Sequence, residues 1–335
     1  MKKNNRSGIE NSGKSRVFGQ KVIPEFSVLL PTYNRSDALE RTLQALEKQS
    51  LAKDKFEIIV VDDGSSDDTS DLLERFAEAT GHHFSYAVLK NNSGPARARN
   101  VGLSMVKGNV VLIIGDDIEP DLSLLEKHFT FHRQRSDEKF ALLGHVSFPK
   151  RLSSNSFMRW LEKDGRKYFF NYAELKAGQE AGPLFFYTCN VSVKTSLLNR
   201  SGWFDESFSY ASHEDLELGY RLADKGMRLV YDPAAKGYHW HVLNIGGIAR
   251  RVYLMGYSAH IFWQKVGESG SGLRRMVRIL LTGICSLPPM VSLWNCLREK
   301  EYSADNSYPI QWKTLLFLGF FIGISDSQKK KKIRI

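Results

Sequence analysis

The sequence predicts an α/β fold in which a single mixed, mostly parallel sheet carries helices on both faces. Short, solidly apolar runs alternate with helical segments in the first half of the chain, as in parallel sheets that are covered on both sides. Polar and acidic clusters follow three of these runs, and open α/β sheets bind ligands beyond the carboxyl ends of their strands. After Gly246 the chain becomes basic and apolar together, which indicates a separate helical region.

Four strands are expected in the first half. The run FSVLL begins at Phe26 and ends in PTYN, and FEIIVV at 56–61 ends in DDGSSDD. FSYAVL at 84–89 and VVLII at 110–114 follow, the last ending in GDDIEP. Each run has the length and composition of a buried strand.

Helices are expected between these strands. Ser36 opens a segment with leucines at helical spacing, and Ser66 is placed to cap the next helix. Pro95 suits the first position of a third helix, and a fourth is expected through His128.

The second half is less regular. Residues 160–186 are rich in aromatic side chains, and 184–193 and 228–233 have the pattern of strands. Between them lies an apolar helix for which Gly226 is a fitting stop.

The C-terminal region indicates contact with a membrane surface. Residues 279–297 contain no charged residue, and their length borders on the ~20 residues of a spanning helix, although two prolines argue against a straight span. Residues 314–324 are too short to cross alone and precede a lysine-rich tail. Basic residues flank both segments, which favours interfacial or re-entrant helices over anionic headgroups. A true span and a helical subdomain packed on the main domain remain alternatives.

The net charge of +10 also indicates polyanionic partners. Because the basic residues crowd the termini and flank apolar segments, they fit lipid headgroups better than nucleic acid. Three distant cysteines without metal-type spacing favour a reducing compartment, and no apolar run follows the basic N-terminus as in a secretory signal. These observations predict a cytoplasmic protein that is peripheral to the inner face of the cell membrane.

Several polar residues could carry chemistry. Asp116 and Asp117 could hold Mg²⁺ or Mn²⁺ together with substrate phosphates, or simply form a solvated loop. Asp63 could accept hydrogen bonds from a base or ribose, or shape an ordinary turn. Arg99 and Asn100, near a helix start, suit phosphate or a solvated helix face.

Two further motifs lie in the second half. Asp215, in HED at the start of a helix, could act as a general base or only cap the helix. His239 and His241, in GYHWH, could ligate a metal or be structural.

The order of the motifs resembles that of an inverting family-2 glycosyltransferase with the GT-A fold. The segments PTYNR, VVDDGSSDDT, GPARARNVG, GDDIEPD, GWFDESF with HEDLELGYRL, and YHWH carry the resemblance over residues 26–242. It implies transfer of a sugar from a nucleotide sugar, most often a UDP-sugar, to a hydroxyl of a glycan or lipid-linked acceptor in polysaccharide or glycolipid synthesis.

The resemblance also implies roles for individual residues. Asp215 would be the general base, and Asp117 with His239 would hold the divalent metal. Donor contacts are implied for Pro31, Thr32, Tyr33, Asp63, Arg99, Asn100, Asp116 and Asn190. Acceptor contacts are suggested for Trp160, Trp203 and Glu214.

The predicted domain organisation follows from the resemblance and the composition. Residues 1–22 are expected to form a flexible basic arm. The GT-A domain would then span 23–245, with a nucleotide-binding half at 23–120 and an acceptor half at 121–245. Residues 246–335 would be the helical, membrane-associating region.

One departure from the family pattern leaves an alternative open. Most members have Asp-x-Asp after the fourth strand, whereas Gly115 here holds the first acidic position. A scaffold that binds nucleotide sugar or glycan but has weakened catalysis is therefore the alternative. An NAD-type oxidoreductase lacks support because no GxGxxG follows the first strand. A sugar nucleotidyltransferase would need a glycine- and arginine-rich loop where PTYN stands.

Overall fold

A computed structural model describes residues 12–18, 23–152, 156–163, 170–208, 210, 212–267, 272–300 and 308–331. The chain forms two compact units, which are described separately. The sheet unit comprises residues 1–148 and 172–240, and the helical unit comprises residues 149–171 and 241–335. The segment 149–171, which the sequence suggested as part of the acceptor half, therefore belongs with the C-terminal helices.

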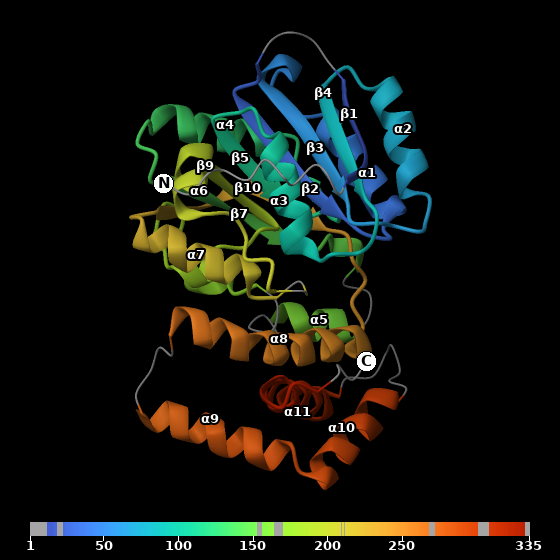
Figure 1. Ribbon diagram of the computed structural model, residues 1–335, viewed down its shortest axis with the longest axis vertical. Helices are drawn as coiled ribbons and strands as arrows, with labels where there is room; N and C mark the ends of the chain where they lie inside the picture. The colour runs from blue at the N-terminus through green and yellow to red at the C-terminus, as the bar shows by residue number, and fades with distance from the viewer. Residues whose placement is uncertain are drawn as a thin grey trace. The chain divides into compact units, whose positions relative to one another are not determined.

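The described part of the sheet unit contains one sheet in the order β1-β4-β3-β2-β5-β9-β7-β10-β6, with β8 paired to β10 (Figure 1). The strands are β1 (Ser12–Phe18), β2 (Phe26–Thr32), β3 (Phe56–Asp62), β4 (His83–Leu89), β5 (Val110–Ile114), β6 (Ile118–Pro120), β7 (Phe140–Ser147), β8 (Glu180–Ala181), β9 (Asn190–Lys194) and β10 (Arg228–His239).

The sheet is mixed, with a parallel centre. β2 pairs in parallel with β3 and β5, and β3 pairs in parallel with β4. β9 runs antiparallel between β5 and β7, and β7 pairs in parallel with β10. The strands β3 and β5 are buried along their whole length, as expected for strands covered on both faces. The predicted α/β fold class is therefore confirmed.

Helices of the sheet unit connect and cover these strands. They are α1 (Ser36–Glu47), α2 (Thr69–Ala79), α3 (Pro95–Met105), α4 (Leu124–Gln134), α6 (Thr195–Ser201) and α7 (Glu214–Asp224), with 3-10 turns at Lys53–Lys55, Tyr172–Glu174 and Pro183–Phe185. α3 lies unusually close to the sheet, since a Cβ at Gly102 would be 2.1 Å from Leu29 Cδ1 on β2. This close packing fixes the position of α3 over β2 and β3.

Three expectations about individual elements are corrected. Residues 12–18, expected in a flexible arm, form β1 and pair antiparallel with β4, because the backbone of an edge strand can pair regardless of side chains. Residues 1–11 and 19–22 of that arm lie outside the described residues. Of the strand expected at 184–193, only the last four residues are strand, in β9 (Asn190–Lys194). The strand expected at 228–233 continues to His239 past a register shift between Asp232 and Lys236.

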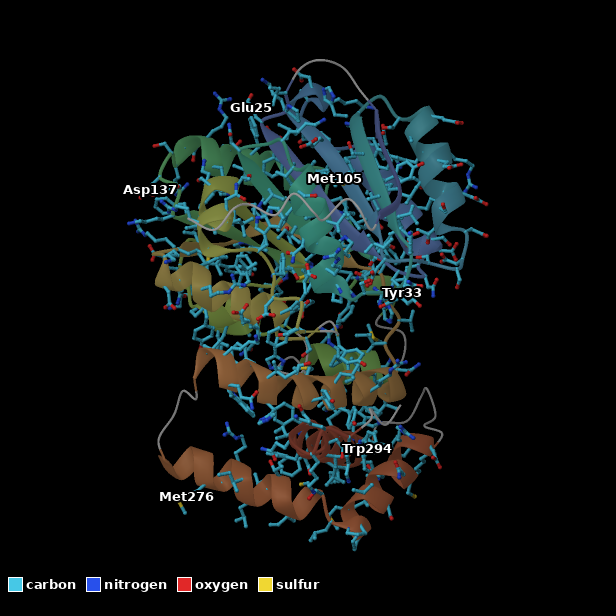
Figure 2. The ribbon with its side chains drawn as sticks, viewed as in Figure 1. Glu25, Tyr33, Met105, Asp137, Met276 and Trp294 are labelled. Atoms are coloured by element: carbon cyan, nitrogen blue, oxygen red, sulfur yellow. The ribbon has the colours of Figure 1, made fainter. Side chains whose placement is uncertain are left out.

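The helical unit consists of α5 (Ser156–Lys163), α8 (Ile245–Val266), α9 (Gly272–Cys285), α10 (Pro288–Glu299) and α11 (Pro309–Gln328), with a 3-10 turn at Lys150–Leu152. α8 and α11 pack with their backbones in close approach. A Cβ at Gly256 would be 1.9 Å from the Phe320 carbonyl oxygen, and one at Gly323 would be 2.1 Å from that of Tyr253. Trp294 and Trp312 are buried in this packing, and Figure 2 marks Trp294.

The two apolar C-terminal segments have different surroundings. The segment 314–324 lies in α11, where Leu315, Leu316, Ile322 and Ile324 are buried. The segment 279–297 is divided between α9 and α10. Within the described residues, no single helix is both long and apolar enough to cross a bilayer. The segments Met276–Cys285 and Pro288–Glu299 reach the required length and apolar character when they are taken together, but they are bent by 72° at the break between them.

Candidate active site

The functional candidates of the sheet unit gather beyond the carboxyl ends of its parallel strands. β2 leads into Tyr33 and Arg35, β3 into Asp63, and β5 into the Asp116–Asp117 pair. β10 runs in the same direction as β5, because β5 and β7 each pair antiparallel with β9 while β7 pairs in parallel with β10. His239, the last residue of β10, therefore lies at the same edge of the sheet.

Asp116 and Asp117 are buried and tied to β2 and its following loop. Thr32 Oγ1 donates to Asp116 Oδ2 at 2.8 Å. Arg35 Nη1 lies 3.3 Å from Asp116 Oδ1 and 2.8 Å from Asp117 Oδ2, so one guanidinium nitrogen bridges both carboxylates. His239 Nε2 lies 3.4 Å from the same Asp117 Oδ2. The pair, Arg35 and His239 thus form one cluster.

Burial decides the protonation behaviour of this cluster. It raises the pKa of Asp116 to about 6, with a further rise from the charge of Asp117, and Arg35 and Thr32 oppose the shift. Gly115 lies against the Asp117 carboxylate, since a Cβ there would be 3.0 Å from Asp117 Oδ1. The glycine therefore leaves room for Asp117, and an aspartate in its place would crowd that carboxylate.

The residues fit a divalent ion that is shared with a substrate. Asp117 supplies a carboxylate oxygen, which suits Mg²⁺ or Mn²⁺, and 3.4 Å from it His239 supplies an imidazole nitrogen, which suits a transition metal such as Mn²⁺. Within the described ranges, no group of three His, Cys, Asp or Glu side chains is arranged as a complete protein site. An ion bound here would therefore need further oxygen ligands, and diphosphate oxygens are suitable.

Asp63 is engaged in shaping the loop that precedes α3. Its Oδ1 accepts from the Ser93 amide and its Oδ2 from the Gly94 amide, both at 2.8 Å. Burial nevertheless raises its pKa to about 6. Gly94, at φ 89°, makes the turn that starts α3. The carboxylate thus fixes the start of α3, and a contact with a base or ribose would have to add to these bonds.

Arg99 and Asn100 connect α3 to the second half of the unit. Arg99 Nη1 forms a buried ion pair with Glu214 Oε1 at 2.8 Å. The Asn100 amide holds the loop before α7, donating to the Phe204 carbonyl at 2.9 Å and to Glu206 Oε1 at 2.8 Å. Both side chains therefore connect α3 to the loop before α7 and to its first residue, and the implied donor contacts stay expectations.

The Arg99–Glu214 pair places the N-terminus of α7, and with it Asp215, beside α3. Asp215 is partly buried, and its Oδ1 accepts from the Leu216 amide at 2.8 Å. His213, which precedes the helix, adopts a left-handed backbone with φ 68°, a conformation that is unusual for a residue with a Cβ. Such backbone conformations cluster at functional sites. Glu214, suggested for the acceptor, is instead the buried partner of Arg99.

Asn190 is engaged inside the sheet unit. Its side chain is fully buried, with Nδ2 donating to the Ala235 carbonyl at 2.9 Å and Oδ1 bonded to His128 Nε2 at 2.9 Å. It therefore joins β9 to β10 and α4, and a contact with the donor sugar stays an expectation. Burial lowers the pKa of His128 to about 4, so this contact involves a neutral imidazole at neutral pH.

The remaining candidates differ in exposure. Pro31 is partly buried, and Thr32 is buried against Asp116, whereas Tyr33 is 43% exposed at the end of β2 (Figure 2). Trp203 is partly exposed and donates to Asn199 Oδ1 at 3.0 Å. Trp160 lies in the helical unit, where it is buried against Trp312 with ring centroids 5.4 Å apart. The suggested contact of Trp160 with an acceptor stays an expectation.

Arg35 is the site residue that the sequence reasoning missed. It follows the PTYN turn directly, at the carboxyl end of a predicted strand, and a charged residue there was a usable signal. Its two carboxylate partners are 81 and 82 residues away, and no local pattern indicates that pairing.

Comparisons with known proteins identify relatives of this chain. Residues 27–191 match the model of Glycosyl transferase family 2. Validoxylamine A glucosyltransferase from Streptomyces hygroscopicus subsp. jinggangensis is 28% identical over 225 residues, which cover 61% of this chain and 53% of that protein. Chondroitin synthase from Escherichia coli is 28% identical over 250 residues, which cover 66% of this chain and 35% of that protein. The chain thus spans about half or less of the length of these relatives.

A solved structure extends the likeness to the fold. The mannosyltransferase PcManGT from Pyrobaculum calidifontis, in complex with GDP-Man and Mn²⁺, superposes with a TM-score of 0.60 at 20% identity, covering 93% of this chain and 89% of that one. Together with the mixed sheet and the motif order, these matches confirm the predicted relationship. Residues 27–191 of the chain thus match glycosyl transferase family 2, and the chain has the GT-A fold.

Proposed function

We propose that this chain transfers a sugar from a nucleoside diphosphate sugar to a hydroxyl group of a glycan or lipid-linked acceptor, with inversion at the anomeric carbon. One observation carries the proposal. The cluster of Asp116, Asp117 and His239 lies at the carboxyl edge of the sheet, and the Arg99–Glu214 ion pair holds the start of α7 beside α3, which begins at that edge.

The donor would bind across the ends of β2, β3 and β5. The exposed ring of Tyr33 is suited to stack on the nucleotide base. The loop that Asp63 holds leads into α3, whose N-terminal amides favour phosphate oxygens. We propose a UDP-sugar as the donor, and because PcManGT holds GDP-Man, a donor screen must include both bases.

The diphosphate leaving group would lie against Asp117, His239 and Arg35. A divalent Mg²⁺ or Mn²⁺ ion held by Asp117 and His239 would supply positive charge for the departing diphosphate. Arg35 stands at the same carboxylates and offers a second positive group on a side chain that is 44% exposed. Charge that is already in place where negative charge develops lowers the barrier to departure.

Asp215 would act as the general base. Its carboxylate takes the proton of the acceptor hydroxyl while that oxygen attacks the anomeric carbon from the face opposite the diphosphate. The bond between the anomeric carbon and the phosphate oxygen breaks as the new glycosidic bond forms. The electron pair leaves with the nucleoside diphosphate. One displacement of this kind inverts the anomeric configuration.

The acceptor and the cellular location are proposals of the same kind. Trp203 is partly exposed in the loop before α7 and offers an aromatic face to an acceptor sugar. Nucleotide sugars are supplied in the cytoplasm, so we propose that the enzyme works at the inner face of the cell membrane. A surface polysaccharide or a lipid-linked glycan would then be the acceptor class.

A thermal-shift screen tests donor binding. Purified full-length protein is mixed with UDP- and GDP-sugars, with and without Mn²⁺, and the Asp117→Asn variant is measured in parallel. We expect one donor to raise the midpoint, more strongly with Mn²⁺, and the Mn²⁺ increment to disappear in Asp117→Asn. The absence of a shift with every donor would contradict the proposal.

A weakened scaffold is the second candidate, because Gly115 removes one acid of the usual motif. An assay that measures release of nucleoside diphosphate from the bound donor distinguishes the two functions. An enzyme releases it at a rate that depends on Asp215, whereas a scaffold binds the donor and leaves it intact.

A further inference from the structure

We infer that the outward face of α9, together with the first turn of α10, is a docking surface for an anionic lipid bilayer. The surface is a set of exposed apolar side chains on one side of α9 and its exit: Met276, Val277, Ile279, Leu280, Ile284 and Leu287, between 44% and 67% exposed. The inference concerns how the helical unit is held at a membrane, and it does not depend on the chemistry of sugar transfer.

α9 is two-sided in the folded helical unit. Its inward side carries Thr282 and Cys285, which are buried, and Arg278, whose guanidinium lies 3.9 Å from the centroid of the Trp263 ring. Figure 2 shows Met276 on the opposite side, pointing away from α8 and α11. At 100° per residue, Met276, Leu280 and Ile284 fall within one quarter of the helix circumference, and Leu287 follows at the start of α10. The exposed apolar residues thus form a stripe.

The apolar stripe of α9 is not a remnant of the core. α11 is more uniformly apolar than α9, and most of its apolar residues are buried against the other helices of the unit. The unit therefore already has its core, formed around Trp294 and Trp312. Soluble proteins seldom expose contiguous apolar patches unless the patch binds something.

Charge identifies the partner. The residues of the helical unit include 20 Lys and Arg against 7 Asp and Glu, a net charge of +13, whereas the remaining residues carry 27 against 30, a net charge of −3. The net positive charge of the chain therefore comes entirely from the helical unit, which exposes the apolar stripe. Arg274 and Arg275 precede the stripe in the sequence, and Arg298 and Lys300 follow it. Apolar residues between basic ones match a bilayer with anionic headgroups.

The shape of the helix pair favours lying on the surface over crossing it. α9 has 14 residues and α10 has 12, and each is shorter than the roughly 20 residues that a spanning helix needs. The bend of 72° between them prevents one straight span. The exposed Pro288 and Pro289 at the bend prolong the apolar surface into α10. An interfacial helix buries only one face, and α9 has one such face available.

Vesicle co-flotation tests the inference on the full-length protein without nucleotide sugar, so that failure of the proposed catalysis would not affect the result. Vesicles of phosphatidylcholine alone are compared with vesicles that also contain phosphatidylglycerol. We expect binding to the anionic vesicles, weakened by added salt, and at least ~tenfold weaker binding for Leu280→Glu/Ile284→Glu. The matched control is Leu122→Glu, which changes a leucine of the sheet unit that is 61% exposed and should bind like wild type.

Three results would overturn the inference. They are no binding of wild type to anionic vesicles, equal binding of the double variant, and a wild type that is dimeric in solution while the double variant is monomeric. The last result would show that a second copy covers the stripe. Circular dichroism checks that the variant is folded, and the milder Leu280→Ser, expected to weaken binding by a smaller factor, replaces it if it is not.

Discussion

Replacing Arg35 should strengthen metal binding in the absence of donor. The guanidinium of Arg35 lies 3.3 Å from Asp116 Oδ1 and 2.8 Å from Asp117 Oδ2. The same Asp117 Oδ2 also lies 3.4 Å from His239 Nε2. A divalent ion held by Asp117 and His239 must therefore take up a position that Arg35 now contests. Arg35→Gln removes the competing positive charge and keeps a polar side chain of similar length.

The size of the effect follows from the exposure of Arg35. Its side chain is 44% exposed, so each bridge is screened by solvent and resembles a surface ion pair of up to ~1 kcal/mol. Displacing the guanidinium thus costs roughly 1 kcal/mol, and its removal should lower the Kd for Mn²⁺ about fivefold.

Isothermal titration of Mn²⁺ into the donor-free protein measures the change. Arg35→Lys retains the charge and should remain near wild type. Arg97→Gln is the matched control, because Arg97 pairs with Glu206 at 3.2 Å and has no contact with the acid pair. An unchanged or higher Kd in Arg35→Gln would refute the competition between Arg35 and the ion. The proposal that Asp117 holds the ion also requires that Asp117→Asn loses Mn²⁺ binding.

Further predictions concern stability and the acidic pair. Arg99→Met should lower the free energy of unfolding in urea by about 3–5 kcal/mol, because it leaves the buried Glu214 carboxylate without its partner, and the double variant Arg99→Met/Glu214→Met should recover most of that loss. The raised pKa values of Asp63 and Asp116, both about 6, mean that the folded state keeps protons that the unfolded state releases near pH 4. Their contribution to stability is therefore fully present below pH 4 and lost as the pH rises to 6. The fall in thermal midpoint from pH 4 to 6 should be smaller in Asp63→Asn than in wild type, and an equal fall would contradict the assignment. Gly115→Asp should lower the thermal midpoint without metal, because its Cβ would crowd the carboxylate two residues on, and should enlarge the rise caused by Mn²⁺. A midpoint that is insensitive to Mn²⁺ would contradict the second part.

The central strands were predictable because they are buried on both faces. β2, β3, β4 and β5 are runs of apolar residues that end at polar turns, and such runs have few alternatives. β7 was not predicted, although FALLGHVS is largely apolar, and the full extent of β10 was obscured by the register shift between Asp232 and Lys236. Pairing with distant strands defines both elements.

The motifs located the candidate site better than they assigned its contacts. The motif order correctly predicted that the acid pair and Asp63 follow strands and that Asp215 lies at the start of a helix. It also predicted the position of His239 near the end of a strand. It could not show which way a side chain points. Asn190 points into the core, and Arg99 points to a glutamate 115 residues further along the chain. Tertiary contacts of this kind leave no local trace in one sequence.

The apolar C-terminal segments show the same limit. Two apolar stretches flanked by basic residues are equivalent in sequence, yet α11 is buried in the helical unit and α9 exposes one face. The close packing of α11 against α8, through Gly256 and Gly323, distinguishes the two segments.

The role of Asp215 is the central claim, and one kinetic comparison tests it most directly. Once the donor is known, release of nucleoside diphosphate is measured for wild type, Asp215→Asn and the control Asp224→Asn, which changes an exposed aspartate at the other end of α7. We expect Asp215→Asn to lose about 100-fold or more in rate with an unchanged donor Kd, while the control behaves as wild type. Release by Asp215→Asn within a few-fold of the wild-type rate would contradict the assignment of the base.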